Sequence, residues 1–259
     1  MKPKIDLKVG LEFSPQIFII SSKDQKDKLE CCDIEPSLYG DFVDVAMLGL
    51  PTLQVLIDSG IPILGAVHLS QRFRQFRPLR LDETIRISGR IVEINPHPRG
   101  SIIYCEFKYE NEQDQICVEA TRSGIIPLGA KEPSNSIFRP KEDLDGFNKI
   151  SQKILKPSKV ASFSKEAGNL IHSDVEVAKK HGFRAPIAAG LMGVHLYREV
   201  IARYMGNPEC FDMEIWFRRP MFWDDTLSLL TKRKNENINA MHLLGGDGKP
   251  TSNCLIHSM

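Results

Sequence analysis

The segment Arg77–Ile87, RPLRLDETIRI, reappears later in the chain as Arg219–Leu229, RPMFWDDTLSL, and the two align without a gap. Both copies follow the pattern R-P-[LM]-x-x-D-[ED]-T-[IL]-x-[IL]. Proline fixes the backbone angle φ, the acidic pair and the threonine favour a turn, and the alternating aliphatic residues are typical of a strand that faces a core. The repeat therefore predicts a duplicated unit, in which the same turn leads into the same strand in each half of the chain.

The sequence around each copy indicates one helix and one antiparallel meander per unit. Residues 43–59 have helical spacing, and Gly60 and Pro62 mark the end of that helix. In the second half a helical pattern extends from Pro186, the expected first helical residue, to Gly206. Strand-like segments lie at 67–76, 83–94, 101–109 and 115–126, and again at 213–218, 226–232, 238–244 and 251–257. We expect an α+β fold with two copies related by a pseudo-twofold axis.

The chain is long enough for two such units. Its 259 residues, of which 42% are hydrophobic, exceed an ordinary single domain of about 100–200 residues. Residues 127–150 contain three prolines, two glycines and many charges without a sustained period, which is typical of a linker. We expect an N-terminal repeat at 1–130, a linker at 131–150 and a C-terminal repeat at 151–259.

Charge and composition argue against several classes of partner. Lysine and arginine number 34 against 33 aspartate and glutamate, so the net charge of +1 gives no overall field for nucleic acid or an anionic membrane. No apolar run approaches the roughly 18 residues of a membrane-spanning helix, and the expected location is the cytoplasm. The six cysteines include no C-x-x-C pair, which favours buried free thiols over disulfides or a metal site. No cofactor or metal is expected.

The stretch from Ala167 to Gly193 carries the candidate site. Asn169 and His172 lie three residues apart in a non-periodic turn, and a mostly apolar helical run follows. A polar loop next to a buried helix is a plausible place for a site, although each residue also has a structural interpretation. His172 is equally the type of residue that forms a hydrogen-bonded core position, Asn169 is a turn residue, and Gly190 permits close packing. Asp174 is most simply a helix N-cap.

The same stretch resembles a family signature. Asn169–Asp174 (NLIHSD) and Gly182–Gly190 (GFRAPIAAG) resemble D-x-N-P-[LIV]-H-x-D followed by G-F-x-x-P-I-x-H-G-M, the signature of the MaoC-like dehydratases and (R)-specific enoyl-CoA hydratases. The first half, from Leu64 onward, is similar to the N-terminal repeat of the two-domain members. The resemblance implies a double hot-dog fold: two antiparallel sheets, each wrapping a central helix, related by pseudo-twofold symmetry.

The resemblance also implies a reaction and roles for individual residues. Water would add across the double bond of a trans-2-enoyl thioester, or leave a (R)-3-hydroxyacyl thioester, with the acyl group carried by coenzyme A or an acyl carrier protein. His172 would be the acid or base, Asn169 the loop support and the Gly190 N–H the donor to the thioester oxygen. Hydration needs such basic and acidic groups near one another and preorganised donors for the developing enolate. The expected substrate contacts are Arg184, Ile187 and Leu191.

One departure from the signature bears on activity. The position of the family's catalytic Asp is Ala167, and the neighbouring Glu166 is the candidate substitute. Three functions therefore stay open. They are a hydratase or dehydratase, a non-catalytic protein that binds acyl thioesters, and a thioesterase with Glu166 as base. Whether the doubled unit also forms a homodimer stays open.

Overall fold

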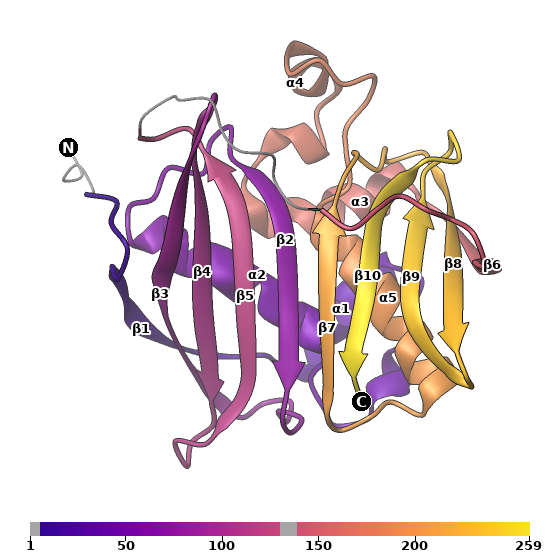
Figure 1. Cartoon of the computed structure of the whole chain (residues 1–259), viewed down its shortest axis with the longest axis horizontal. Helices are drawn as coiled ribbons and strands as arrows, with labels where there is room; N and C mark the ends of the chain where they lie inside the picture. Colours follow the sequence, from indigo (N-terminus) through magenta and orange to yellow (C-terminus); the bar gives the residue numbers. More distant parts are fainter. Residues whose placement is uncertain (1–5, 130–138) are drawn as a thin grey trace.

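The computed structural model describes residues 6–129 and 139–259, and its centre is one antiparallel sheet of ten strands (Figure 1). The order of the strands across the sheet is β1-β3-β4-β5-β2-β7-β10-β9-β8-β6. Their bounds are β1 (Glu12–Ile19), β2 (Val67–Gln75), β3 (Thr84–His97), β4 (Gly100–Glu110), β5 (Ile116–Ile126), β6 (Asn148–Ile154), β7 (Phe211–Phe217), β8 (Thr226–Lys234), β9 (Asn237–Leu244) and β10 (Pro250–Ser258).

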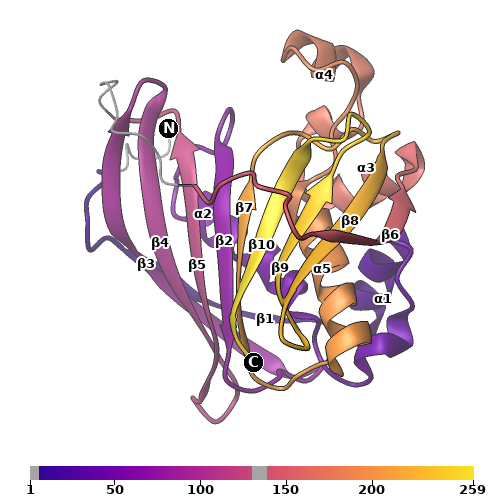
Figure 2. The same cartoon turned by 45° about the vertical axis from the view of Figure 1, so that its right-hand side comes forward.

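The helices gather on one side of this sheet (Figures 1 and 2). The α-helices are α1 (Ser22–Cys31), α2 (Gly49–Asp58), α3 (Pro157–Ser164), α4 (Val175–Lys180) and α5 (Gly190–Met205). Short 3-10 helices are η1 (Pro36–Tyr39), η2 (Val45–Leu48), η3 (Lys165–Ala167) and η4 (Leu170–His172). Helices α2 and α5 are the central helices of the first and second halves of the sheet.

The strand order confirms the expected duplication. From either edge inward, the strands β1, β3, β4, β5, β2 of the first half correspond to β6, β8, β9, β10, β7 of the second. The repeated threonines occupy equivalent places, because Thr84 begins β3 and Thr226 begins β8. The expectation of two sheets needs one correction. Strands β2 and β7 pair from Ser70 opposite Trp216 to Gln75 opposite Phe211, so the two half-sheets form one continuous sheet.

Two helices differ from the sequence-based expectation. Helix α5 begins at Gly190 and not at Pro186, because the residues after the proline pair with another segment: Ile187 bridges to Phe222, and the Ala188 N–H donates to the Met221 carbonyl at 2.8 Å. Helix α1 was not expected, since its sequence is charged and it buries only Gln25 and Leu29. A capping box starts this helix.

Two further expectations concern the linker and the thiols. Residues 131–138 of the expected linker, and residue 130 before it, lie outside the described residues, and β6 begins at Asn148, inside the expected linker. The cysteines form no disulfide; four of them are buried, Cys31 is half-buried and Cys210 is exposed. Among the described residues, no helix is long and apolar enough to cross a membrane.

A buried carboxylate joins the two halves between the central helices. Asp44, the N-cap of η2, has no exposed surface, and its Oδ2 lies 2.6 Å from Nδ1 of His195 on α5. Its Oδ1 lies 3.5 Å from Nε of Arg198, which is also buried. On the other side, the Asp44 N–H donates to Oε1 of Gln25 at 2.7 Å. The cluster therefore connects α1, η2 and α5.

We expect Asp44→Ala to lower the free energy of unfolding by about 3–5 kcal/mol, because it leaves the buried Arg198 cation without its counter-charge. Chemical denaturation measures this change. Asp41→Ala removes an exposed carboxylate three residues earlier and is the matched control, for which we expect less than about 0.5 kcal/mol. Equal losses in the two variants would contradict the role assigned to the cluster.

Candidate active site

A cavity of about 880 Å³ opens between the central helices, the sheet and the loops before α5. Both halves of the chain line it, the first with residues of α2, β2, β4 and β5 and the second with residues of η4, α5 and β7. It brings together most of the residues that the sequence singled out, namely Glu166, Asn169, His172, Ile187, Gly190 and Leu191.

His172 is fixed in one tautomer by a backbone contact. Its Nδ1 lies 2.7 Å from the Ile187 carbonyl oxygen, and since a carbonyl only accepts, Nδ1 carries the proton. The neutral ring therefore presents Nε2 as an acceptor. Burial lowers the pKa of His172, although the hydrogen bond to Ile187 opposes this shift. The imidazole is thus a neutral base at pH 7.

The loop that carries His172 is held by its own backbone and by Asn169. The Asn169 side chain caps η4, because its Oδ1 accepts the Ile171 N–H at 3.2 Å. The Ile171 carbonyl in turn accepts the Ile187 N–H at 3.2 Å. This second bond joins the loop to Ile187, whose carbonyl oxygen accepts the hydrogen bond from Nδ1 of His172. Asn169 therefore positions the histidine through the backbone.

Gly190 begins α5 at the wall of the same cavity. The N-cap is Ala189, which makes no side-chain capping bond, so the first turn presents backbone N–H groups that lack acceptors within the helix. The helix dipole adds partial positive charge at this end. A Cβ on Gly190 would lie 2.9 Å from the Phe217 ring, so only glycine fits this close approach. The arrangement can bind a carbonyl oxygen or an anion.

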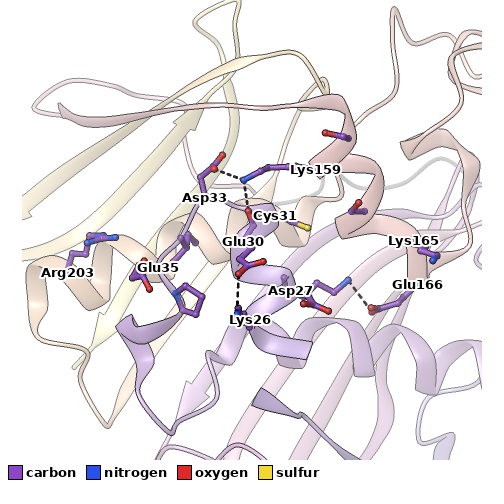
Figure 3. Close-up of a pocket in the computed structure, with 15 residues that line it drawn as sticks. Lys26, Asp27, Glu30, Cys31, Asp33, Glu35, Lys159, Lys165, Glu166 and Arg203 are labelled. Atoms are coloured by element: carbon purple, nitrogen blue, oxygen red, sulfur yellow. Dashed lines mark hydrogen bonds and ion pairs between the residues drawn. The ribbon is translucent and has the colours of Figure 1, made fainter. Parts of the chain in front are cut away.

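Glu166 turns away from this arrangement toward α1. Its Oε2 lies 3.1 Å from Nζ of Lys28, and its side chain is 61% exposed. Figure 3 shows it at one end of an open groove whose labelled residues are mostly charged and come from α1 and the segment after it, α3, η3 and α5. Among the described residues, no hydrogen bond or ion pair joins Glu166 to His172. The cavity wall also contains Asp24, but this carboxylate belongs to the capping box of α1.

Arg184, an expected substrate contact, is not among the residues that line the cavity. Its guanidinium lies 2.8 Å from Asp224 and 2.7 Å from Asp225, and it stacks over the Phe222 ring at 4.0 Å. These contacts hold it against the turn that precedes β8. Asp174 caps α4 as expected, since its Oδ1 accepts the N–H groups of two residues in the first turn.

The sequence did not point to several ionisable residues of the cavity. His195, which bonds to Asp44, lines it from α5; His68 and Arg122 line it from β2 and β5. His68 Nε2 lies 3.0 Å from the Ser70 carbonyl, and its ring packs 4.5 Å from that of Phe217. His68 lies in the stretch from Leu64 that resembles the N-terminal repeat, where the sequence favours a structural role for it. The partner of His195 is 151 residues away, so no local pattern could have identified that contact.

Comparison with protein-family models and with curated protein sequences finds no match. Solved structures do match over nearly the whole chain. HtdX from Mycobacterium tuberculosis is 16% identical, with a TM-score of 0.74 over 96% of this chain and 100% of that one. A MaoC-like dehydratase from Phytophthora capsici is 13% identical, with a TM-score of 0.74 over 97% of each chain.

A third structure, Rv0216 from Mycobacterium tuberculosis, has a double hot-dog fold and is 13% identical, with a TM-score of 0.62 over 96% of each chain. This chain has the double hot-dog fold. The fold expected from the resemblance is therefore confirmed. Identities this low establish the fold alone.

The pKa of His68, a histidine of the double hot-dog cavity, predicts how the stability of the folded chain depends on pH. Burial and the nearby Arg122 lower the pKa of His68 well below 6.5, so the unfolded chain binds a proton that the folded chain does not. Stability is then fully present above pH 6.5 and decreases as the pH falls. We expect His68→Gln to reduce the slope of unfolding free energy between pH 6.5 and 5 by up to about 1.4 kcal/mol per pH unit. Denaturation at several pH values measures it, and an unchanged slope would contradict the assignment.

Proposed function

We propose that the chain binds acyl thioesters and catalyses the reversible hydration of trans-2-enoyl thioesters to (R)-3-hydroxyacyl thioesters. The observation that carries this proposal is the placement of His172 on the same cavity as the first turn of α5. His172 supplies a neutral base whose Nδ1–H is already bonded to Ile187, and the first turn of α5 supplies N–H donors. A base for the attacking water and donors for the developing enolate are two of the groups that addition to an enoyl thioester uses.

The reaction assigns each group one task. The thioester oxygen accepts an N–H from the first turn of α5 at Gly190, which stabilises the negative charge that develops on it. A water bonded to Nε2 of His172 attacks C3, and its proton moves to Nε2. With Ala167 at the position of the catalytic Asp, the proton on Nε2 then passes to C2 as the enolate electrons form the new C–H bond, so the elements of one water are added and His172 is neutral again. Elimination is the same sequence in reverse.

The second acid or base is the weak point of this site. The signature position of the catalytic Asp is Ala167, and the Glu166 carboxylate pairs with Lys28. A positioned acid or base contributes typically about 10²–10⁴-fold to a rate. We therefore expect hydration that is slow for this fold. The ion pair of Glu166 favours a second candidate, a protein that binds acyl thioesters without turnover. It disfavours a thioesterase with Glu166 as base.

We expect His172→Ala to lower kcat/KM for the hydration of crotonyl-CoA by about 10²–10⁴-fold, because it removes the base at C3. The loss of the enoyl-thioester absorbance follows the reaction. His257→Ala changes an exposed histidine that does not line the cavity and should leave the rate unchanged. Binding of butyryl-CoA without hydration in the wild type would instead identify the non-catalytic protein.

Ala167→Asp tests whether a carboxylate is what limits the rate. If the chain is a hydratase, we expect this substitution to raise kcat by up to about 10²–10⁴-fold. Lys165→Asp is the matched control, since it adds a carboxylate at the exposed beginning of the same 3-10 helix. A gain in both variants, or in neither, would contradict the role proposed for position 167.

A further inference from the structure

Arg122 places a guanidinium inside the first half of the molecule. It lies in β5, opposite Gln71 of β2 and Cys105 of β4, and helix α2 crosses behind these strands in Figure 1. The side chain faces this helix, because Nη1 lies 3.4 Å from Oγ1 of Thr52. Arg122 also lines the cavity, in a region shared with the apolar side chains of Leu53, Leu56 and Ile103.

Surrounding protein atoms exclude much of the solvent from this guanidinium. Burial lowers the pKa of Arg122 to about 10, although the residue keeps part of its surface accessible. The two facts agree if the accessible surface faces the cavity and not bulk solvent. The ionisable neighbours supply no charge, because burial raises the pKa of the Cys105 thiol to about 12 and raises the pKa of the Tyr109 hydroxyl well above its ordinary value. The Tyr109 hydroxyl donates to the Leu48 carbonyl at 2.5 Å.

No carboxylate pairs with Arg122 in the part of the chain that the structure describes. Other arginines of the sheet behave differently: Arg72 bonds both carboxylate oxygens of Asp212, at 2.7 and 2.6 Å. An unpaired buried cation destabilises a folded protein, and buried charges are normally paired. The missing counter-charge is therefore expected from a ligand that enters the cavity.

We propose that Arg122 binds a carboxylate at the far end of the acyl chain, so that the preferred ligands are thioesters of dicarboxylic acids. The inference rests on the proposed function for the thioester end, which His172 and Gly190 hold in the second half. Arg122 lies in the first half, and apolar side chains there suit the methylene groups of the chain. A planar guanidinium matches a carboxylate through two parallel N–H donors.

The test compares acyl groups of equal length. Adipoyl-CoA and suberoyl-CoA carry a terminal carboxylate, whereas hexanoyl-CoA and octanoyl-CoA do not, and none of them can be hydrated. We expect calorimetric titration at pH 7.5 to show a preference of about 10- to 100-fold for the carboxylated ligand at one length at least. Arg122→Met should abolish the preference, and Arg122→Lys should retain part of it. Arg74→Met removes an exposed charge from β2, outside the cavity, and should retain all of it.

Each other outcome has a defined meaning. Equal affinity of the wild type for both ligand types, or an unchanged preference in Arg122→Met, overturns the inference. Binding of coenzyme A alone that is lost in Arg122→Met also overturns the inference, because the anion that Arg122 binds is then a phosphate of coenzyme A. If no coenzyme A thioester binds, the proposed function fails, while the inference is still tested by free hexanoate against hexanamide, since only hexanoate carries a carboxylate. Thermal protection by hexanoate and not by hexanamide, lost in Arg122→Met, supports it, and equal protection by the two compounds overturns it.

Discussion

Asp44 is a carboxylate without exposed surface, and the arrangement of the two halves depends on how it is neutralised. A buried anion is costly unless cations and N–H donors surround it. The carboxylate contacts His195 and Arg198 from α5 and the N–H of Ala46 in its own turn. The backbone N–H of Asp44 donates to Oε1 of Gln25 from α1. The apolar faces of the helices pack in the common core, and the contacts of Asp44 join α5 to the segment that leads into α2.

Fixing the two helices also fixes the cavity. A Cβ on Gly49 at the start of α2 would collide with Leu191 in the first turn of α5, so the N-termini of the central helices meet. The pseudo-twofold relation places the N-terminus of α2 on one side of this contact and that of α5 on the other, yet the residues around the two N-termini differ. A polar loop with His172 lies beside the start of α5, and the first half of the cavity has Arg122 in a mostly apolar region. Two copies of one unit thus supply different ends of a single cavity.

The sequence predicts what is local and repeats. The turn before β3 and β8 was visible because its proline, acidic pair and threonine act on neighbouring residues. The capping role of Asp174 was visible for the same reason. Contacts between segments that are distant in the chain leave no pattern in the sequence. Helix α5 begins four residues after Pro186 because the intervening residues bridge to Phe222, and Asp44 meets His195 across 151 positions. The candidate site likewise contains residues that the sequence identified and one that it did not: the resemblance indicated His172 and Gly190 but not Arg122.

The two ends of the cavity also differ in what they imply about a ligand. His172 is stable without one, because its Nδ1–H is bonded to Ile187 and its ring is neutral. Its geometry is compatible with catalysis, with slow catalysis or with none. Arg122 is a cation whose environment supplies no opposite charge, so the folded chain is less stable with it than with an apolar residue of similar size. The cost is offset when an anion occupies the cavity. Arg122 therefore gains stability from a bound anion, whereas the rate of a reaction at His172 depends on the carboxylate that position 167 lacks.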